Sequence, residues 1–193
     1  MADWTIGTGS NPSHGRSRGG AATPLIRYFE ESTCASTAVI KLGDIVALDT
    51  VVSTGGPRVV RAPAGGGNGA NLLLTNALVG VAAEGSTSDG STAGLLAGGS
   101  AGARGKKIGV FTCEPDAEYL GYLSAGASHS TQIGTQKAVR YDSTNHVYMI
   151  DSTNSTAALA FVTITDIPDQ HVGDTNGPVY FKFLSSNVSA VVA

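Results

Sequence analysis

The chain has 193 residues, enough for one large or two small domains that fold without disulfides. Its 12 Lys and Arg residues against 15 Asp and Glu give a net charge of −3, and no apolar run approaches the roughly 20 residues of a membrane span, so neither nucleic acid nor a membrane is an expected partner. Charged residues make up only 14% of the chain, against about 25% in typical soluble proteins, which predicts a surface largely covered by other chains.

Residues 1–36 are predicted to form an extended N-terminal arm. The segment is rich in Gly and Ser, and its polar first 20 residues do not resemble a secretory signal. The one apolar group lies in PLIRYFEES, residues 24–32, which is expected to form one helical turn or an extended anchor. Because such a composition cannot build a core of its own, we expect the arm to lie across a neighbouring subunit.

Two kinds of side chain in this arm are predicted to contact the partner. Arginine suits planar carboxylate contacts, and apolar and aromatic side chains often dominate interfaces by filling shallow grooves. The predicted contact residues are Arg16, Arg18, Leu25, Ile26, Arg27, Tyr28 and Phe29. The alternative is an arm that folds back on the chain's own barrel.

From residue 37 onward the sequence predicts β-strands. Short runs rich in Val, Ile and aromatic residues recur roughly every 10–15 residues between turn-forming residues. The runs are DIVALD, RVVRA, LVGVAAE, KKIGVFTC, AEYLGYL, TQKAVRYD, HVYMID, ALAFVTITDI, VYFKFL and VSAVVA. Without a convincing helical period, this predicts an all-β protein of barrel-like or sandwich modules, with a first β-barrel-like module at 37–123 and a second β portion at 124–193.

The run NLLLTNALVGV predicts an oligomer interface. Leu72, Leu73 and Leu74 stand in a row beside long Gly-rich loops, and exposed clusters of this kind often mark interfaces. We expect a homotrimer, with a dimer as the second choice. The alternative places these leucines in the subunit's own core.

Several motifs are candidates for catalytic or metal sites. GGSAG, residues 98–102, matches a nucleophile elbow around Ser100, but its flanks lack the strand and helix that an elbow needs. Glu114, Asp116 and Glu118 could share one strand face, although Pro115 favours a solvated strand edge. Cys34 and Cys113 have no metal-ligand spacing and are expected to be reduced thiols. No catalytic residue and no cofactor is therefore predicted.

Three acidic residues and a histidine lie close together between two predicted strands, in the stretch VTITDIPDQHVGDTNGPVYFKFL. Asp166, Asp169, His171 and Asp174 could bind a metal, but their spacing matches no calcium loop and Pro168 interrupts them. Asp, Asn and Gly are also the residues that tight turns require. The favoured interpretation is a structural connection; a cation site and a catalytic site are the alternatives.

A series of short sequence segments resembles the head decoration, or cement, proteins of tailed bacteriophages. The resemblance covers about residues 40–184 and includes GDIVALDT, LVGVAAEG, KKIGVFTCEPDAEYLG and, most recognisably, GDTNGPVYFKFL. It implies a small all-β protein without enzymatic activity. Such a protein would be made in the host cytoplasm, bind the major capsid protein on the outer surface of the phage head, and stabilise the head by bridging neighbouring subunits.

Three other classes compete with this interpretation. A tail-fibre or carbohydrate-binding β module would recognise glycans. A minor capsid or connector subunit would occur in few copies per particle. A β-barrel hydrolase would use Ser100 or a metal held between Asp166 and Asp174.

Overall fold

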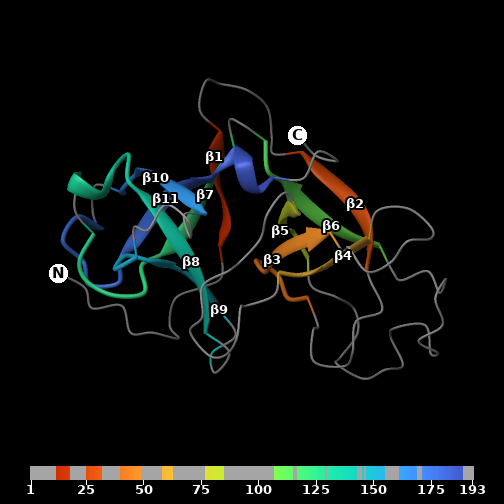
Figure 1. The fold of residues 1–193 in the computed structure, drawn as a ribbon, viewed down its shortest axis with the longest axis horizontal. Coiled ribbons are helices and arrows are strands. Elements are labelled where there is room, and N and C mark those ends of the chain that lie inside the picture. The colour runs from red at the N-terminus through yellow and green to blue at the C-terminus, as the bar shows by residue number, and fades with distance from the viewer. Residues whose placement is uncertain are drawn as a thin grey trace.

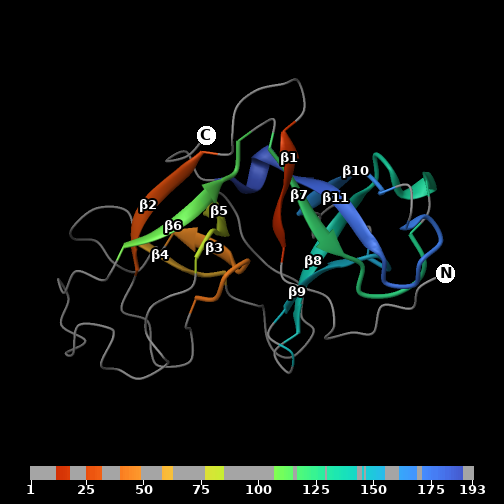
Figure 2. The ribbon, with the colours of Figure 1, turned by 180° about the vertical axis from the view of Figure 1, so that it is seen from behind.

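The computed structural model describes residues 12–17, 25–31, 40–48, 58–62, 77–84, 107–114, 117–128, 130–142, 145, 147–154, 161–168 and 171–188. In these residues the regular structure is β-strand with short 3₁₀ turns, which confirms the predicted all-β class. The strands form a closed barrel and a six-stranded sheet, which lie side by side in Figures 1 and 2.

The barrel contains five strands in the order β2-β4-β3-β5-β6. Their bounds are Ile26–Glu31 (β2), Ile45–Leu48 (β3), Arg58–Arg61 (β4), Leu78–Ala82 (β5) and Lys107–Thr112 (β6). β6 pairs with β2 and closes the barrel; β2 and β4 are parallel and the other pairs antiparallel. The apolar side chains that fill it include Phe29, Val46, Val59, Val79, Ile108 and Val110.

The six-stranded sheet has the order β1-β7-β11-β10-β8-β9. Its strands are Ser13–Ser17 (β1), Ala117–Tyr122 (β7), Gln136–Asp142 (β8), Val147–Asp151 (β9), Val162–Asp166 (β10) and Pro178–Phe183 (β11). The sheet curls back on itself, because Leu123 forms a parallel bridge with Ile150 and the Ser124 amide donates to the Ile150 carbonyl at 2.8 Å. The edge of β9 is thereby partly paired.

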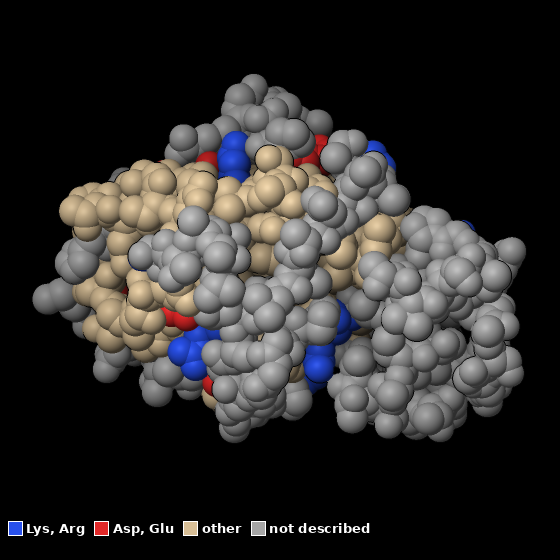
Figure 3. Space-filling model, in the orientation of Figure 1, with Lys and Arg blue, Asp and Glu red and all other residues tan. Residues whose placement is uncertain are grey.

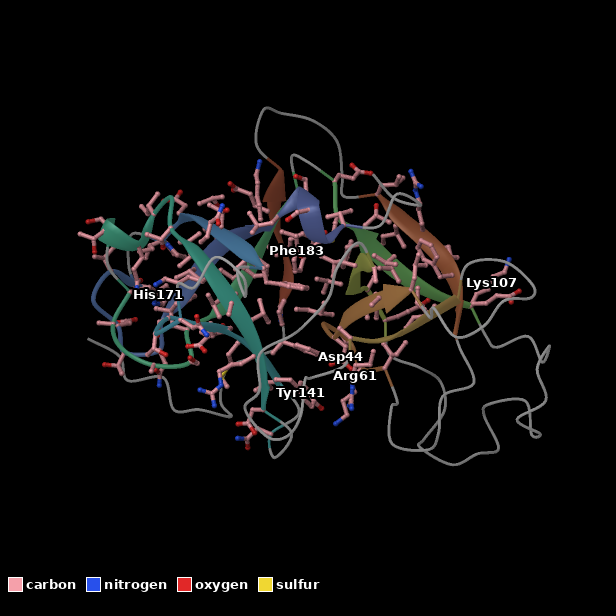
Figure 4. The ribbon with its side chains drawn as sticks, viewed as in Figure 1. Asp44, Arg61, Lys107, Tyr141, His171 and Phe183 are labelled. Carbon is pink, nitrogen blue, oxygen red and sulfur yellow. The ribbon has the colours of Figure 1, made fainter. Side chains whose placement is uncertain are left out.

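One hydrophobic core joins the barrel and the sheet. Buried residues of β3 and β5 belong to the same cluster as those of β7 to β11. Aromatic rings dominate the sheet side: Tyr119 stacks on Phe181, with centroids 5.8 Å apart, and Phe183 meets Tyr119 edge-on at 5.0 Å. Figure 4 places Phe183 between the two units. The two units therefore pack as one body, and neither buries its full apolar surface alone.

The strand assignments move the predicted module boundaries. β7 pairs with β1 and β11 in the sheet, so the barrel ends at β6 and not at residue 123. β2 lies within the predicted arm of residues 1–36 yet forms part of the barrel wall. The division at 36, 37–123 and 124–193 is therefore replaced by a barrel over 26–112 and a sheet formed by 13–17 and 117–183.

The arm prediction is corrected for Phe29. This side chain is buried inside the barrel with Ile108 and Val110, so it cannot fill a groove on a partner. The reason is the strand period: with Tyr28 facing outward, the next residue of β2 faces inward. The described parts of the arm follow the alternative in which the arm folds back on the chain's own strands.

Candidate interaction face

Exposed apolar side chains concentrate at the start of β2. Leu25, Ile26 and Tyr28 are 43%, 41% and 64% exposed. The other large apolar side chains exposed in the described residues are dispersed along the chain, at Leu42, Ile133 and Val172. Three such residues within four positions form a patch, which is the usual mark of an interaction surface, whereas single exposed apolar residues are normal.

A glycine of β6 forms the floor of this patch. Tyr28 is paired with Gly109, and Ile26 with Phe111. A Cβ atom at Gly109 would lie 3.2 Å from Ile26 Cγ2 and 3.5 Å from Tyr28 Cε1, so a larger residue would crowd both side chains. We call Leu25, Ile26, Tyr28 and Gly109 the β2 face.

A few charged groups lie beside the β2 face. The exposed Glu84 accepts a hydrogen bond from the Gly109 amide at 2.6 Å, which holds its carboxylate at the face. Arg27 and Lys107, both exposed, provide cations on β2 and β6; Figure 4 shows Lys107 at the far end of the barrel. Figure 3 shows that charges are sparse over the described part of the visible surface. The face is thus apolar with a few fixed charges at its margin.

Sequence reasoning identified only part of this face. Leu25, Ile26 and Tyr28 were predicted as contact residues, and they do lie together on the surface. Glu84 and Gly109 were not singled out, because they are 25 residues apart and come together only when β5 and β6 pair. The glycine inside the apolar run KIGVF was the one available signal, since glycine in a strand often marks close approach of other groups.

A polar cluster joins the barrel to the sheet. The Arg61 guanidinium donates to the Tyr141 hydroxyl at 2.9 Å, and the Tyr148 hydroxyl donates to the Ala62 carbonyl at 2.9 Å. Figure 4 shows Asp44, Arg61 and Tyr141 gathered where the two units meet. Burial raises the pKa of Tyr148 well above its usual value, and the Asp44 carboxylate raises that pKa further while Arg61 lowers it. Tyr148 is therefore a neutral hydrogen-bond donor, whereas the Tyr141 hydroxyl accepts the bond from Arg61.

The Asp- and Gly-rich connection is tied to residues 123–128 by backbone hydrogen bonds. The Ser128 amide donates to the Asp174 carbonyl at 3.0 Å, and the Gly173 amide donates to the Ser128 carbonyl at 2.7 Å. Gly173 has a φ of 93° and Asn176 a φ of 53°, which are left-handed conformations that favour Gly and Asn. These contacts support the favoured interpretation of the stretch as a structural connection.

Ser128, His171 and Asp174 lie together but lack the geometry of a catalytic triad. His171 Nδ1 is 2.8 Å from the Asp174 carboxylate, as in a triad. The Ser128 hydroxyl, however, is buried and donates to the backbone carbonyl of His171 at 2.5 Å. It is therefore placed to stabilise the turn and not to attack a substrate.

The remaining predicted site residues are dispersed or lie outside the described residues. β1 places the backbone of Arg16 opposite Glu118, whose side chain is fully buried and not on a solvated edge. Cys113 is buried, and burial raises the pKa of its thiol while a hydrogen bond from Tyr119 lowers it. The residues outside the described part of the chain are Arg18, Cys34, Leu72, Leu73, Leu74, Ser100, Asp116 and Asp169.

The described residues hold neither a candidate metal cluster nor a candidate membrane-spanning helix. They contain no group of three or more His, Cys, Asp or Glu side chains placed to hold a metal ion. Within the same residues, no helix is long and apolar enough to cross a membrane.

Comparison with known proteins found no matching family model, no matching curated protein and no matching solved structure.

Proposed function

We propose that this chain is a structural decoration protein of a tailed-phage head, which binds the outer surface of the capsid and bridges neighbouring subunits. In this proposal the partner is the major capsid protein, the location is the virion, and the chain catalyses no reaction. The β2 face is the observation that carries it, because a cluster of exposed apolar side chains on a β-strand is suited to binding another protein surface.

The resemblance in the sequence supports the same conclusion. The phrase GDTNGPVYFKFL corresponds to the connection around Asp174 and to β11, which are structural elements here. The other phrases fall mainly on strands of the barrel and sheet. Because the resemblance lies mainly in strands and turns, it fits a protein whose function depends on its shape and its binding surface.

The shared core supports a mechanical role. A protein that bridges two capsid subunits must transmit mechanical force between them without its barrel and sheet coming apart. Here the barrel and the sheet share buried residues and are joined by the Arg61–Tyr141 and Tyr148–Ala62 contacts. Many modest contacts on several subunits would then act together, as multivalent binding does.

In this proposal, Tyr28 and Ile26 of the β2 face anchor the chain to the capsid protein. Tyr28 is the most exposed large apolar side chain of the described residues, and aromatic anchors often contribute most of the affinity of an interface. Lys107 at the margin would pair with a carboxylate of the capsid protein. Exposed ion pairs contribute only about 0–1 kcal/mol, so the apolar residues are expected to matter more.

The test is the occupancy of heads by surface variants. Particles of the phage that encodes this chain would be produced without it and then incubated with purified protein. Tyr28→Ala combined with Ile26→Ser should lower occupancy, and Ile133→Ser, an exposed apolar residue outside the β2 face, serves as the matched control. Wild-type occupancy for the double variant would overturn the role of the face, and no binding of the wild-type protein to heads would overturn the decoration function. Binding of the wild-type protein to a glycan array instead would favour a carbohydrate-binding module.

A further inference from the structure

The connection before β11 contains the dipeptide Asn176–Gly177, and the fold restricts both positions. Asn176 has a φ of 53°, a left-handed conformation that Asn adopts more readily than most residues. Gly177 is buried, and a Cβ atom there would lie 2.9 Å from Ser128 Oγ and 3.0 Å from the Asp174 carbonyl oxygen. So close an approach excludes any side chain at this position unless the turn moves. The geometry of the turn thus favours Asn followed by Gly.

Asn followed by Gly is chemically labile. Asn is among the thermolabile residues, and a following glycine has no side chain to obstruct attack by its own backbone nitrogen. Once that nitrogen loses its proton to a base, it can form a bond to Asn176 Cγ and close a five-membered succinimide ring. The Cγ–Nδ2 bond then breaks, and Nδ2 takes up a proton and leaves as ammonia. Water next opens the ring at either of its two carbonyl carbons, which gives aspartate or isoaspartate.

In the folded protein the attacking nitrogen is engaged in a hydrogen bond. The Gly177 amide donates to the Asp174 carbonyl at 3.2 Å. The flanking main chain is held as well, because the Asn176 amide donates to the Gly126 carbonyl at 2.7 Å. The Leu123 amide donates to the Gly177 carbonyl at 3.2 Å. Attack on Asn176 Cγ requires the first of these bonds to break, since the nitrogen must lose the proton that it donates.

Ser128 holds the connection in this conformation through two further bonds. Its amide donates at 3.0 Å to the same Asp174 carbonyl, and its hydroxyl donates to the His171 carbonyl at 2.5 Å. Figure 4 shows His171 at the end of the six-stranded sheet that is far from the barrel. The connection can therefore open while the barrel and most of the sheet stay folded, because local opening costs less free energy than global unfolding.

We propose that Asn176–Gly177 is a site of spontaneous deamidation that the fold protects, so that the reaction proceeds only when this connection opens. Water is the co-reactant, and no enzyme is required. An isoaspartate product adds one methylene to the main chain, so the original hydrogen bonds of the turn could not all form again. The modification would thus mark chains in which the connection has opened. This inference concerns the free protein and does not depend on capsid binding.

Peptide mass spectrometry measures the reaction, because an amide and an acid differ in mass. The wild-type protein is incubated in mildly alkaline buffer, folded and in denaturing urea, until Asn68 in the urea sample has reacted. Asn68 also precedes a glycine and is the positive control. Deamidation of Asn176 should be at least about tenfold slower in the folded protein than in urea. Equal rates in the two conditions would overturn the proposal, and so would an Asn176 that stays intact in urea.

A pair of variants tests whether the local hydrogen bonds give the protection. Ser128→Ala removes the bond to the His171 carbonyl and should raise the rate at Asn176 in the folded protein about fivefold. Thr135→Ala, the matched control, removes a hydroxyl that donates to the Gln132 carbonyl at 2.6 Å in another turn, and it should leave the rate unchanged. A wild-type rate in Ser128→Ala, or an equal rise in Thr135→Ala, would contradict protection by this connection. If Ser128→Ala does not fold, the comparison of folded and unfolded wild-type protein decides the proposal.

Discussion

Arg61 and Tyr141 connect the barrel to the sheet through one guanidinium and one ring. Arg61 Nη1 donates to the Tyr141 hydroxyl at 2.9 Å, and Arg61 Cζ lies 4.7 Å from the centroid of the same ring. Arg61 ends β4 of the barrel, and Tyr141 lies near the end of β8. Tyr141 also packs on Tyr148, with centroids 4.8 Å apart, so a cation, two rings and a hydroxyl meet at the joint.

Replacing Arg61 should lower stability by a moderate amount. Arg61→Ala removes a cation–π contact worth roughly 0.5–1 kcal/mol and a hydrogen bond of similar value, so the free energy of unfolding should fall by about 1–2 kcal/mol. Urea denaturation would measure it. Arg61→Lys keeps the charge without the planar group and should recover less than half of the loss. An unchanged urea midpoint for Arg61→Ala would show that the contact adds nothing to stability.

Removing the Tyr148 hydroxyl should lower the stability of the fold. The hydroxyl donates to the Ala62 carbonyl at 2.9 Å, and the Tyr148 side chain is fully buried. Tyr148→Phe leaves that carbonyl without this donor, which should lower the free energy of unfolding by about 1–3 kcal/mol. Tyr180→Phe, at a partly exposed tyrosine of β11, is the control and should change stability less. Equal losses for the two variants would contradict the argument.

The buried tyrosines should also make the fold sensitive to alkali. Burial raises the pKa values of Tyr119, Tyr141 and Tyr148 in the folded state, whereas the unfolded chain ionises its tyrosines near pH 10. The stability held by the neutral hydroxyls is therefore fully present below about pH 10 and is lost as the pH rises through the raised pKa values. Thermal unfolding from pH 8 to pH 11 should show a falling midpoint above pH 10. Tyr148→Phe should make that fall shallower, and an equally steep fall would contradict the role of Tyr148.

Two strand glycines should differ in their tolerance of a methyl group. A Cβ at Gly80 would lie 2.0 Å from the backbone oxygen of Phe111, so β5 and β6 would have to move apart. A Cβ at Gly121 would meet the Phe181 ring edge at 2.8 Å, and a ring can adjust by rotation. We expect Gly80→Ala to lower the free energy of unfolding by about 3 kcal/mol or more, and Gly121→Ala by about 1 kcal/mol. The reverse order in urea denaturation would contradict the pairing of β5 with β6.

The connection around Asp174 should behave as a structural turn. Asp174→Ala removes the buried carboxylate that faces His171 Nδ1 at 2.8 Å, and it should lower the free energy of unfolding by about 1–3 kcal/mol. If the stretch is a turn, EDTA or added Ca²⁺ should leave the melting temperature of the wild-type protein unchanged. A rise in melting temperature with Ca²⁺ that Asp174→Ala abolishes would favour the cation site instead.

Some features of this protein were determined by the sequence alone. Runs such as KIGVFT and VYFKF hold alternating or continuous apolar residues between turn residues, and they form β6 and β11. The all-β class follows from this local chemistry, because strand period depends on residues close together in the chain. The same kind of reasoning, from turn preference, predicts that the Asp174 stretch is a structural connection.

Tertiary structure alone decided which strands belong together. β2 pairs with β6, about 80 residues away, and β1 pairs with β7, about 100 residues away, so no local pattern could place the predicted arm within the two sheets. The inward position of Phe29 and the burial of Glu118 follow from those pairings. The β2 face has the same origin: Gly109 forms its floor and Glu84 its margin only because β5, β6 and β2 are neighbours in a closed barrel. Pairing between distant strands depends on the total burial and hydrogen bonding of the whole fold, which a short stretch of sequence does not contain.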